Sequence, residues 1–138
     1  MTLKHYINFI SFDDGSDIVW SDTGLTDEQI SSANGHPYLR YEELDTNVEQ
    51  VGYNNNMQGD RVITLYFFQN PINGELPPKS EMYSVYRFLL EAPLYVYKET
   101  LNEYFIRLDV TSFQRPIEDV QRSKHLFGYV SYNCLIKY

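Results

Sequence analysis

The sequence predicts an α+β domain, in which an antiparallel sheet that includes a long β-hairpin carries one main helix packed on a face. Two strand patterns and one helical pattern lead to this expectation. Residues 61–68 are nearly all apolar or β-branched, and residues 130–136 alternate apolar and polar side chains with the period of two of a strand. Between these segments, apolar side chains recur at helical spacings of three, four and seven in Met82, Val85, Tyr86 and Leu89.

The N-terminal segment, residues 2–12, is predicted to be a helix with Thr2 as its N-cap. The apolar side chains that recur there at helical spacing are Leu3, Tyr6, Ile7 and Ile10. The sequence Asp-Asp-Gly at residues 13–15 would end this helix. A strand over residues 6–12 is the competing interpretation, because the run is rich in aromatic and β-branched side chains.

A second, short helix is predicted over about residues 27–33. Thr26 and Gln29 have the spacing of a capping box, in which each side chain bonds to the backbone of the other residue. Asn34 and Gly35 tolerate the left-handed backbone conformation that ends helices, and Pro37 follows them.

The long hairpin is predicted from two extended segments and the polar stretch between them. Residues 38–44 read as the first strand, and residues 61–68 read as a second strand that is covered on both faces. Residues 52–60 contain two Gly and three Asn, which tolerate positive φ angles. This stretch is therefore expected to form the turn of the hairpin.

The second half of the chain is expected to begin its regular structure with the main helix, capped by Ser80 and ended by Pro93. Residues 94–97 and 103–110 read as strands. Residues 115–124, which start with Arg-Pro, read as a polar connection to the closing strand.

The length of 138 residues fits a single domain, residues 1–138, and the net charge is −8. The charge is uneven: residues 1–60 hold 11 acidic and 2 basic residues, whereas residues 61–138 hold 8 acidic and 9 basic residues. This balance repels phosphate backbones and argues against nucleic-acid binding. A solvated acidic surface explains the uneven charge, and head-to-tail stacking of subunits is the alternative explanation. No apolar run approaches the ~20 residues of a membrane helix.

No enzyme signature stands out in the sequence. His5, His36 and His125 are far apart, the single Cys134 excludes an intrachain disulfide, and residues 13–17 lack the spacing of a calcium loop. Cys134 lies on the apolar phase of a strand, where a thiol is an inert packing group. We therefore expect no catalysis, metal or cofactor. A small enzyme assembled from distant residues is the alternative, which a carboxylate bonded to one of the histidines in a deep pocket would support.

The candidate interaction residues are polar or exposed positions without another assigned role. Most of them belong to the predicted hairpin turn, and Arg115 belongs to a loosely basic segment that reads as surface or interface. The candidates in the turn are Tyr53, Asn54, Asn55, Asn56, Met57 and Gln58. A solvent-exposed turn without a role is the competing interpretation.

The order of elements resembles that of phage tail-terminator and neck tail-completion proteins. Thr23-Gly24-Leu25 precedes a proline-led first strand, His36-Pro37-Tyr38-Leu39-Arg40-Tyr41, and an apolar second strand follows at residues 61–68. The segments that match the rest of the pattern are a helix at 81–92, a short strand at 105–108 and the terminal Ile136-Lys137-Tyr138.

The resemblance implies a structural virion protein, assembled in the host cytoplasm, that forms a homo-oligomeric ring of usually six subunits. Such a ring ends the tail tube and joins it to the head connector, without a cofactor or a membrane. The alternative from a different class is a small acidic phage protein that binds and inhibits a host factor, with the acidic half of the chain imitating nucleic acid.

Overall fold

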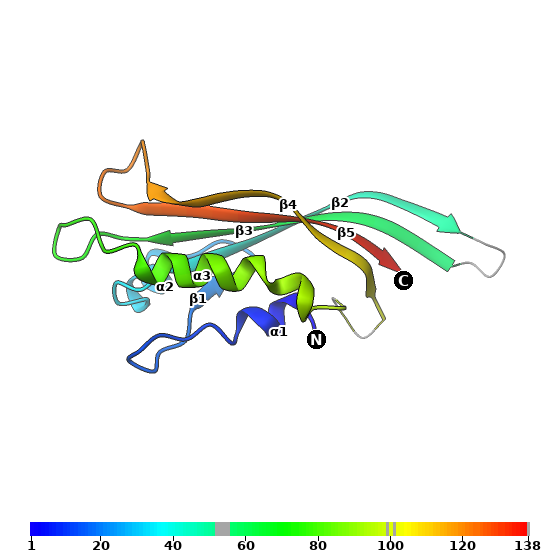
Figure 1. Ribbon diagram of the computed structural model, residues 1–138, viewed down its shortest axis with the longest axis horizontal. Coiled ribbons are helices and arrows are strands. Elements are labelled where there is room, and N and C mark those ends of the chain that lie inside the picture. Colours follow the sequence, from blue (N-terminus) through cyan, green and yellow to red (C-terminus); the bar gives the residue numbers. More distant parts are fainter. Residues whose placement is uncertain (52–55, 99, 101, 138) are drawn as a thin grey trace.

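The computed structural model describes the backbone of residues 1–51, 56–98, 100 and 102–137, and within these ranges the side chains of residues 1–45 and of those after residue 58 (Figure 1). The fold is α+β, as predicted. In chain order its elements are α1 (Leu3–Ile7), β1 (Val19–Ser21), α2 (Asp27–Ser32), β2 (Tyr38–Val51), β3 (Asn56–Gln69), α3 (Ser80–Leu90), the 3₁₀ helix η1 (Ala92–Leu94), β4 (Tyr104–Glu118) and β5 (Leu126–Lys137).

The described strands form one sheet in the order β1-β2-β3-β5-β4. Three neighbouring pairs are antiparallel, but β1 runs parallel to β2, with Val19 opposite Tyr38 and Ser21 opposite Arg40. The sheet is therefore mixed, and the prediction of a purely antiparallel sheet is wrong in this respect. The sequence signal was missing because β1 is three residues long, too short to display a period of two.

The long hairpin is confirmed as β2 and β3, which pair from Tyr38 opposite Phe68 to Val51 opposite Asn56. The predicted turn at residues 52–60 is too long, because residues 56–60 belong to β3. Gly59, for example, pairs with Val48 on one side and with Ile136 on the other. Gly and Asn permit a turn but do not enforce one where cross-strand pairing is available on both sides. Residues 52–55 of the predicted turn lie outside the described residues.

The main helix, α3, packs on one face of the sheet and buries Met82, Val85 and Leu89, as their spacing predicted (Figure 1). Its N-cap is Lys79, without a side-chain capping bond, so Ser80 is the first helical residue and not the predicted cap. The Ser80 carbonyl instead accepts a hydrogen bond from the Ser84 hydroxyl at 3.1 Å. Pro93 lies just beyond the helix, in η1.

The N-terminal segment begins as predicted and ends early. The Thr2 side chain caps α1 by accepting a bond from the His5 N–H at 3.0 Å. The helix ends at Ile7, however, because the chain then folds into a turn in which the Ile18 N–H donates to the Ile10 carbonyl at 3.0 Å. Neither the long helix nor the alternative strand over residues 6–12 forms. Ile10 nonetheless stays buried in the core.

The capping box of Thr26 and Gln29 is present at the start of α2, and positive φ angles at Asn34 and Gly35 follow its end.

Two expectations for the second half of the chain are wrong. Residues 94–97 form η1 and a turn instead of a strand, and β4 extends to Glu118, so Arg115 and Pro116 lie inside it. Proline is tolerated there because β4 is an edge strand and is bulged between Gln114 and Ile117.

Candidate functional site: a histidine clamp beside an apolar groove

The structure separates the predicted interaction residues. Tyr53, Asn54 and Asn55 lie outside the described residues. Asn56, Met57 and Gln58 are strand residues of β3 whose side chains are likewise not described. Arg115 is exposed on β4, close to the residues that pair with Phe127. Since Gln58 pairs with Lys137 and Phe68 pairs with Phe127, Arg115 and the hairpin end lie at opposite ends of the sheet.

His36 stands between two carboxylates that come from distant parts of the chain. Its Nδ1 lies 2.8 Å from Oε2 of Glu81, and its Nε2 lies 2.7 Å from Oδ2 of Asp14. The imidazole also stacks on the ring of Phe12, with ring centroids 4.4 Å apart and planes 1° from parallel. We call His36, Asp14 and Glu81 the histidine clamp. It joins the turn after α1, the turn after α2 and the first turn of α3.

Local sequence places each member of the histidine clamp. The left-handed backbone at Asn34 and Gly35 turns the chain so that His36 lies two residues before the start of β2. Asp14 is held by its own turn, in which Oδ1 accepts bonds from the Ser16 N–H at 2.9 Å and from the Ser16 hydroxyl at 2.6 Å. Glu81 is the acidic residue in the first turn of α3, where the helix dipole favours a negative charge.

The histidine clamp favours a charged imidazolium. Partial burial opposes the charge, but the hydrogen bonds to Asp14 and Glu81 outweigh it and raise the pKa of His36. Bonds from the Ser16 hydroxyl and from His36 hold the pKa of Asp14 well below its usual range. A protonated His36 donates one N–H to each carboxylate. Both ring nitrogens are then occupied, so neither is free to take a proton from a bound molecule.

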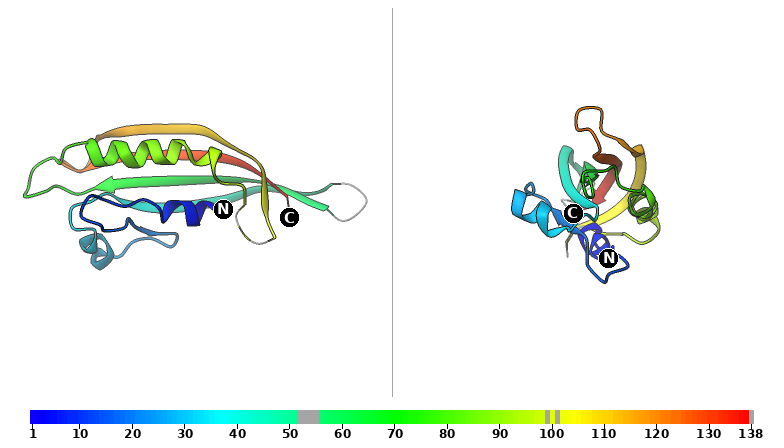
Figure 2. Two further views of the ribbon diagram at one scale, coloured as in Figure 1. Left: turned by 60° about the horizontal axis from the view of Figure 1, so that its bottom comes forward. Right: turned by 90° about the vertical axis from the view of Figure 1, so that its left-hand side faces the viewer.

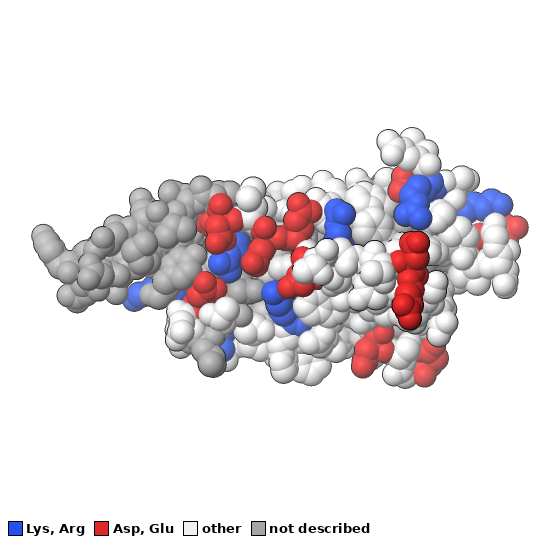
Figure 3. All heavy atoms as spheres, turned by 180° about the vertical axis from the view of Figure 1, so that it is seen from behind, with Lys and Arg blue, Asp and Glu red and all other residues white. Residues whose placement is uncertain are grey.

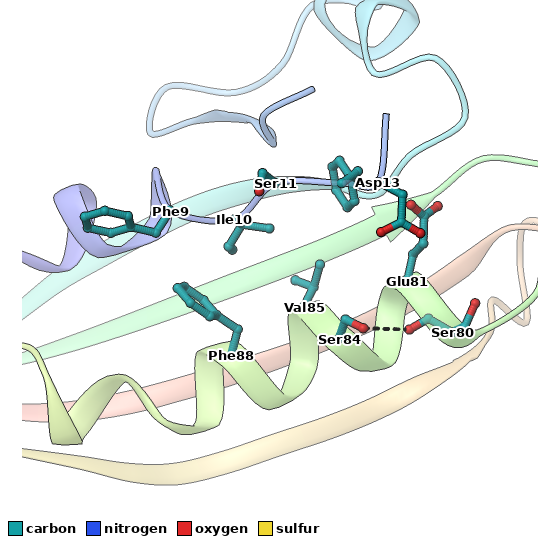
Figure 4. Close-up of a pocket in the computed structure, with 10 residues that line it drawn as sticks. Phe9, Ile10, Ser11, Asp13, Ser80, Glu81, Ser84, Val85 and Phe88 are labelled. Atoms are coloured by element: carbon teal, nitrogen blue, oxygen red, sulfur yellow. Dashed lines mark hydrogen bonds between the residues drawn. The ribbon is translucent and has the colours of Figure 1, made fainter. Parts of the chain in front are cut away.

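A groove of about 300 Å³ runs beside the histidine clamp, between the segment after α1 and one side of α3 (Figure 4). Ile10 and Val85 form its buried apolar floor, and the rings of Phe9 and Phe88 lie at the end away from Asp13 and Glu81 (Figure 4). Its polar rim consists of Ser11, Asp13, Ser80, Glu81 and Ser84. An apolar floor with a carboxylate rim suits an aliphatic side chain next to a cationic group.

The geometry of the histidine clamp can be compared with the alternative prediction, a small enzyme whose site is assembled from distant residues. His36 does meet carboxylates, but it is not among the residues that line the groove, and both of its nitrogens face those carboxylates. His125 bonds to the Ser123 carbonyl, and Cys134 is buried farther along β5. Among the described residues, no group of His, Cys, Asp and Glu side chains is placed to hold a metal ion, and no helix is long and apolar enough to cross a membrane.

The two edges of the sheet differ in chemistry. Beyond Arg40, β2 has no described strand on its outer side, and this open edge carries the exposed acidic side chains Glu42, Glu43 and Asp45. At the other edge, a group of large apolar side chains around the start of β4 is between 49% and 75% exposed. We call this group the β4 patch; it consists of Leu94, Tyr95, Tyr97, Tyr104 and Ile106.

On the face shown in Figure 3, basic side chains are interspersed with acidic and uncharged ones instead of forming a continuous track. Phosphate backbones are bound by clustered Lys and Arg. This face therefore gives no support to nucleic-acid binding, in line with the net charge of −8.

No protein-family model matches the chain, and no curated protein gives a significant match to it.

Sequence reasoning missed the histidine clamp because its members are 22 and 45 residues apart from His36 and belong to no spaced motif. The sequence did indicate that Asp14 lies in an Asp-rich turn and that Glu81 lies at the start of a helix. Nothing in the sequence indicated that both would reach the same imidazole.

Proposed function

We propose that this chain is a structural assembly subunit that contacts further copies of itself head to tail and closes into a ring, in the manner of a phage tail terminator. The observation that carries the proposal is the β4 patch. Exposed apolar groups of this kind mark protein–protein contact surfaces, and Tyr is enriched in such contacts because its ring is large and its hydroxyl tolerates water.

The β4 patch is continuous along the backbone although its members come from two segments. The Phe105 N–H donates to the Tyr97 carbonyl at 2.8 Å, and Lys98 forms an isolated bridge with Tyr104. These contacts hold η1 and the following turn against the start of β4. The backbone segments that carry Tyr97 and Tyr104 are therefore direct neighbours at this edge of the sheet.

The open β2 edge favours a heterologous contact over a symmetric one. Pairing of two β2 edges would bring Glu42, Glu43 and Asp45 of one copy towards the same acidic residues of another, and like charges across a strand pair are destabilising. The opposite edge carries the β4 patch together with exposed Arg115 and with Arg107, which is paired with Asp109. A contact between unlike edges relates each subunit to the next by a fixed rotation. It produces a ring when repeating this rotation returns to the first subunit.

The bulges of β4 favour contact through side chains. Its register with β5 shifts between Phe105 and Arg107, again between Val110 and Ser112, and a third time before Ile117. Such bulges keep an edge strand from adding a regular new strand, which is how proteins avoid open-ended aggregation. If neighbouring subunits meet at this edge through side chains, the shape and charge of the two contacting surfaces set the geometry of the ring.

The phage-specific part of the proposal is supported by the resemblance in element order described above. In this assignment the subunits form a ring, usually of six, that ends the tail tube and joins it to the head connector within the virion. The work is geometric: one face of the ring matches the last ring of the tube, and the other matches the connector. No cofactor or reaction is needed.

Sedimentation velocity over a range of concentrations tests the self-association. We expect the unmodified chain to form a discrete oligomer, and Tyr104→Asp combined with Ile106→Asp to shift it to monomer. Leu76→Asp, which changes a partly exposed residue far from the β4 patch in sequence, serves as the matched control and should leave the oligomer intact. Circular dichroism verifies that each variant is folded. A monomer at every concentration would overturn the proposal.

A further inference from the structure

We infer that the turn between β4 and β5 of one copy docks into the groove beside α3 of the next copy, with Val120 on the apolar floor and Lys124 at the acidic rim. This inference rests on the proposed self-association and names a second pair of surfaces that makes the contact.

Val120 is 95% exposed, which is the largest exposure among the large apolar side chains described. It stands at the tip of a turn that its own hydrogen bonds hold in shape. The Asp119 N–H donates to the His125 carbonyl at 2.8 Å, and the Gln121 N–H donates to Oδ1 of Asp119 at 2.9 Å. A turn that is ordered before contact loses little conformational entropy on docking.

The groove has the dimensions and chemistry to receive this tip. Its volume of about 300 Å³ is at the small end of binding pockets, so it suits one or two side chains better than a larger molecule. Ile10 and Val85 offer an apolar floor to Val120. Asp13 is exposed at the rim, and the carboxylates of Asp14 and Glu81 lie nearby in the histidine clamp.

The charges of the two surfaces favour this pairing. The turn carries exposed Arg122 and Lys124 along with Glu118 and Asp119. Arg122 lines a different hollow, together with Tyr38, and the Asp119 carboxylate already accepts a backbone N–H. Lys124, held at a positive φ of 64°, is therefore the cation available to the Asp13 rim of the next copy.

The turn and the groove lie on different sides of the molecule. In Figure 2, in the view from the end of the molecule, the turn between β4 and β5 projects from the side opposite to the N-terminal segment that forms one wall of the groove. One copy therefore cannot fill its own groove with its own turn. Copies placed side by side bring the turn of one against the groove of the next, which is a heterologous contact.

Site-specific crosslinking tests the pairing directly. In a Cys134→Ser background, Val120→Cys and Ser11→Cys place one thiol on the turn and one at the groove rim. Mild oxidation is expected to give a ladder of covalent oligomers. Each single-cysteine variant should give at most a dimer, and a control pair, Val120→Cys with Ser32→Cys on α2, should give no ladder.

A charge exchange supplies the second readout, measured by sedimentation. Lys124→Asp and Asp13→Lys should each weaken association about tenfold or more, and the two together should restore it. If the unmodified chain associates but no ladder forms and Val120→Asp changes nothing, the docking inference is overturned while the proposed function stands. If the unmodified chain is monomeric, both are overturned.

Discussion

The imidazole Nδ1 of His36 lies 2.8 Å from the carboxylate of Glu81, although 45 positions separate the two residues in the sequence. Together with the bond from His36 to Asp14, this contact fixes the segment after α1 against the start of α3. These two segments are the walls of the groove. The histidine clamp therefore ties the shape of a candidate contact surface to the protonation state of one side chain.

The histidine clamp predicts a pH-dependent stability. The pKa of His36 is raised above its ordinary value of 6.5, so the folded state holds the proton more tightly than the unfolded state. The stabilisation is complete below a pH of about 6.5 and is lost as the pH rises through the folded-state pKa. His36→Gln should therefore lower the free energy of unfolding more at pH 6 than at pH 8.5, by about 0.5–1 kcal/mol after solvent screening.

Urea unfolding of the unmodified chain and of His36→Gln at both pH values provides this measurement. The range stays well above the lowered pKa of Asp14, so that carboxylate remains ionised throughout. A difference between the two proteins that does not change with pH would show that folding does not raise the pKa of His36.

Arg61 is predicted to be a stabilising charge of the hairpin. Its side chain is buried, and it contacts Asp45 at 2.5 Å and Glu103 at 3.3 Å. Arg61→Met should cost about 2–4 kcal/mol in the free energy of unfolding, because it leaves the half-buried Glu103 carboxylate without its partner. The measurement is chemical denaturation at neutral pH.

The matched control is Arg107→Met on β4. This arginine pairs with Asp109 at 2.7 Å, but its side chain is 71% exposed. Exposed ion pairs contribute about 0–1 kcal/mol, so the control should stay within that range. Equal losses for the two variants would contradict the role given to burial.

Gly128 is predicted to be required for the close approach of β5 to Phe67. A Cβ atom at position 128 would lie 2.6 Å from the Phe67 ring and 2.9 Å from the Gln114 carbonyl oxygen. Gly128→Ala should therefore destabilise the fold by about 1–3 kcal/mol, the usual cost of overpacking. Thermal unfolding followed by circular dichroism measures the change.

A double-mutant cycle separates this steric effect from a general loss of glycine. Phe67→Leu removes the ring atoms that would clash, so the combination with Gly128→Ala should cost less than the sum of the single changes by about 0.5 kcal/mol or more. If the two changes in the free energy of unfolding are strictly additive, the strain in Gly128→Ala does not come from a clash with the Phe67 ring.

Tyr132 is predicted to fasten α3 to the sheet. Its buried hydroxyl donates to the Leu89 carbonyl in the last turn of the helix, and burial raises the pKa of this phenol well above its usual range. Tyr132→Phe removes this bond, although the Glu91 N–H still reaches the Leu89 carbonyl, and should cost about 0.5–1.5 kcal/mol. Tyr97→Phe, at an exposed ring, is the control and should change the free energy of unfolding by less than about 0.5 kcal/mol.

The elements that could be predicted from the sequence are those with a regular apolar spacing or a capping motif. The helical face of Met82, Val85 and Leu89, the capping box at Thr26 and the long hairpin all followed from local spacing. Spacing could not locate β1, which is three residues long and gains its place from pairing with β2. It also overestimated the length of α1, since Ile10 is buried in the turn after the helix, where its N–H donates to the Ile7 carbonyl three residues back.

The candidate sites depended on contacts that no local pattern encodes. His36 meets Asp14 and Glu81 because three separate turns converge, and the β4 patch forms because the chain after η1 folds back onto the start of β4. Arg115 was correctly placed on the surface, although it lies in a strand and not in a connection. For the hairpin tip, the role in contacts remains a prediction.

Electron micrographs of the purified protein test the central claim, that unlike surfaces of this subunit meet and close. We predict rings of uniform diameter, which disappear when Tyr104 and Ile106 are both replaced by Asp and persist in Leu76→Asp. Scattered particles of the size of a single 16.3 kDa chain at every concentration would contradict it.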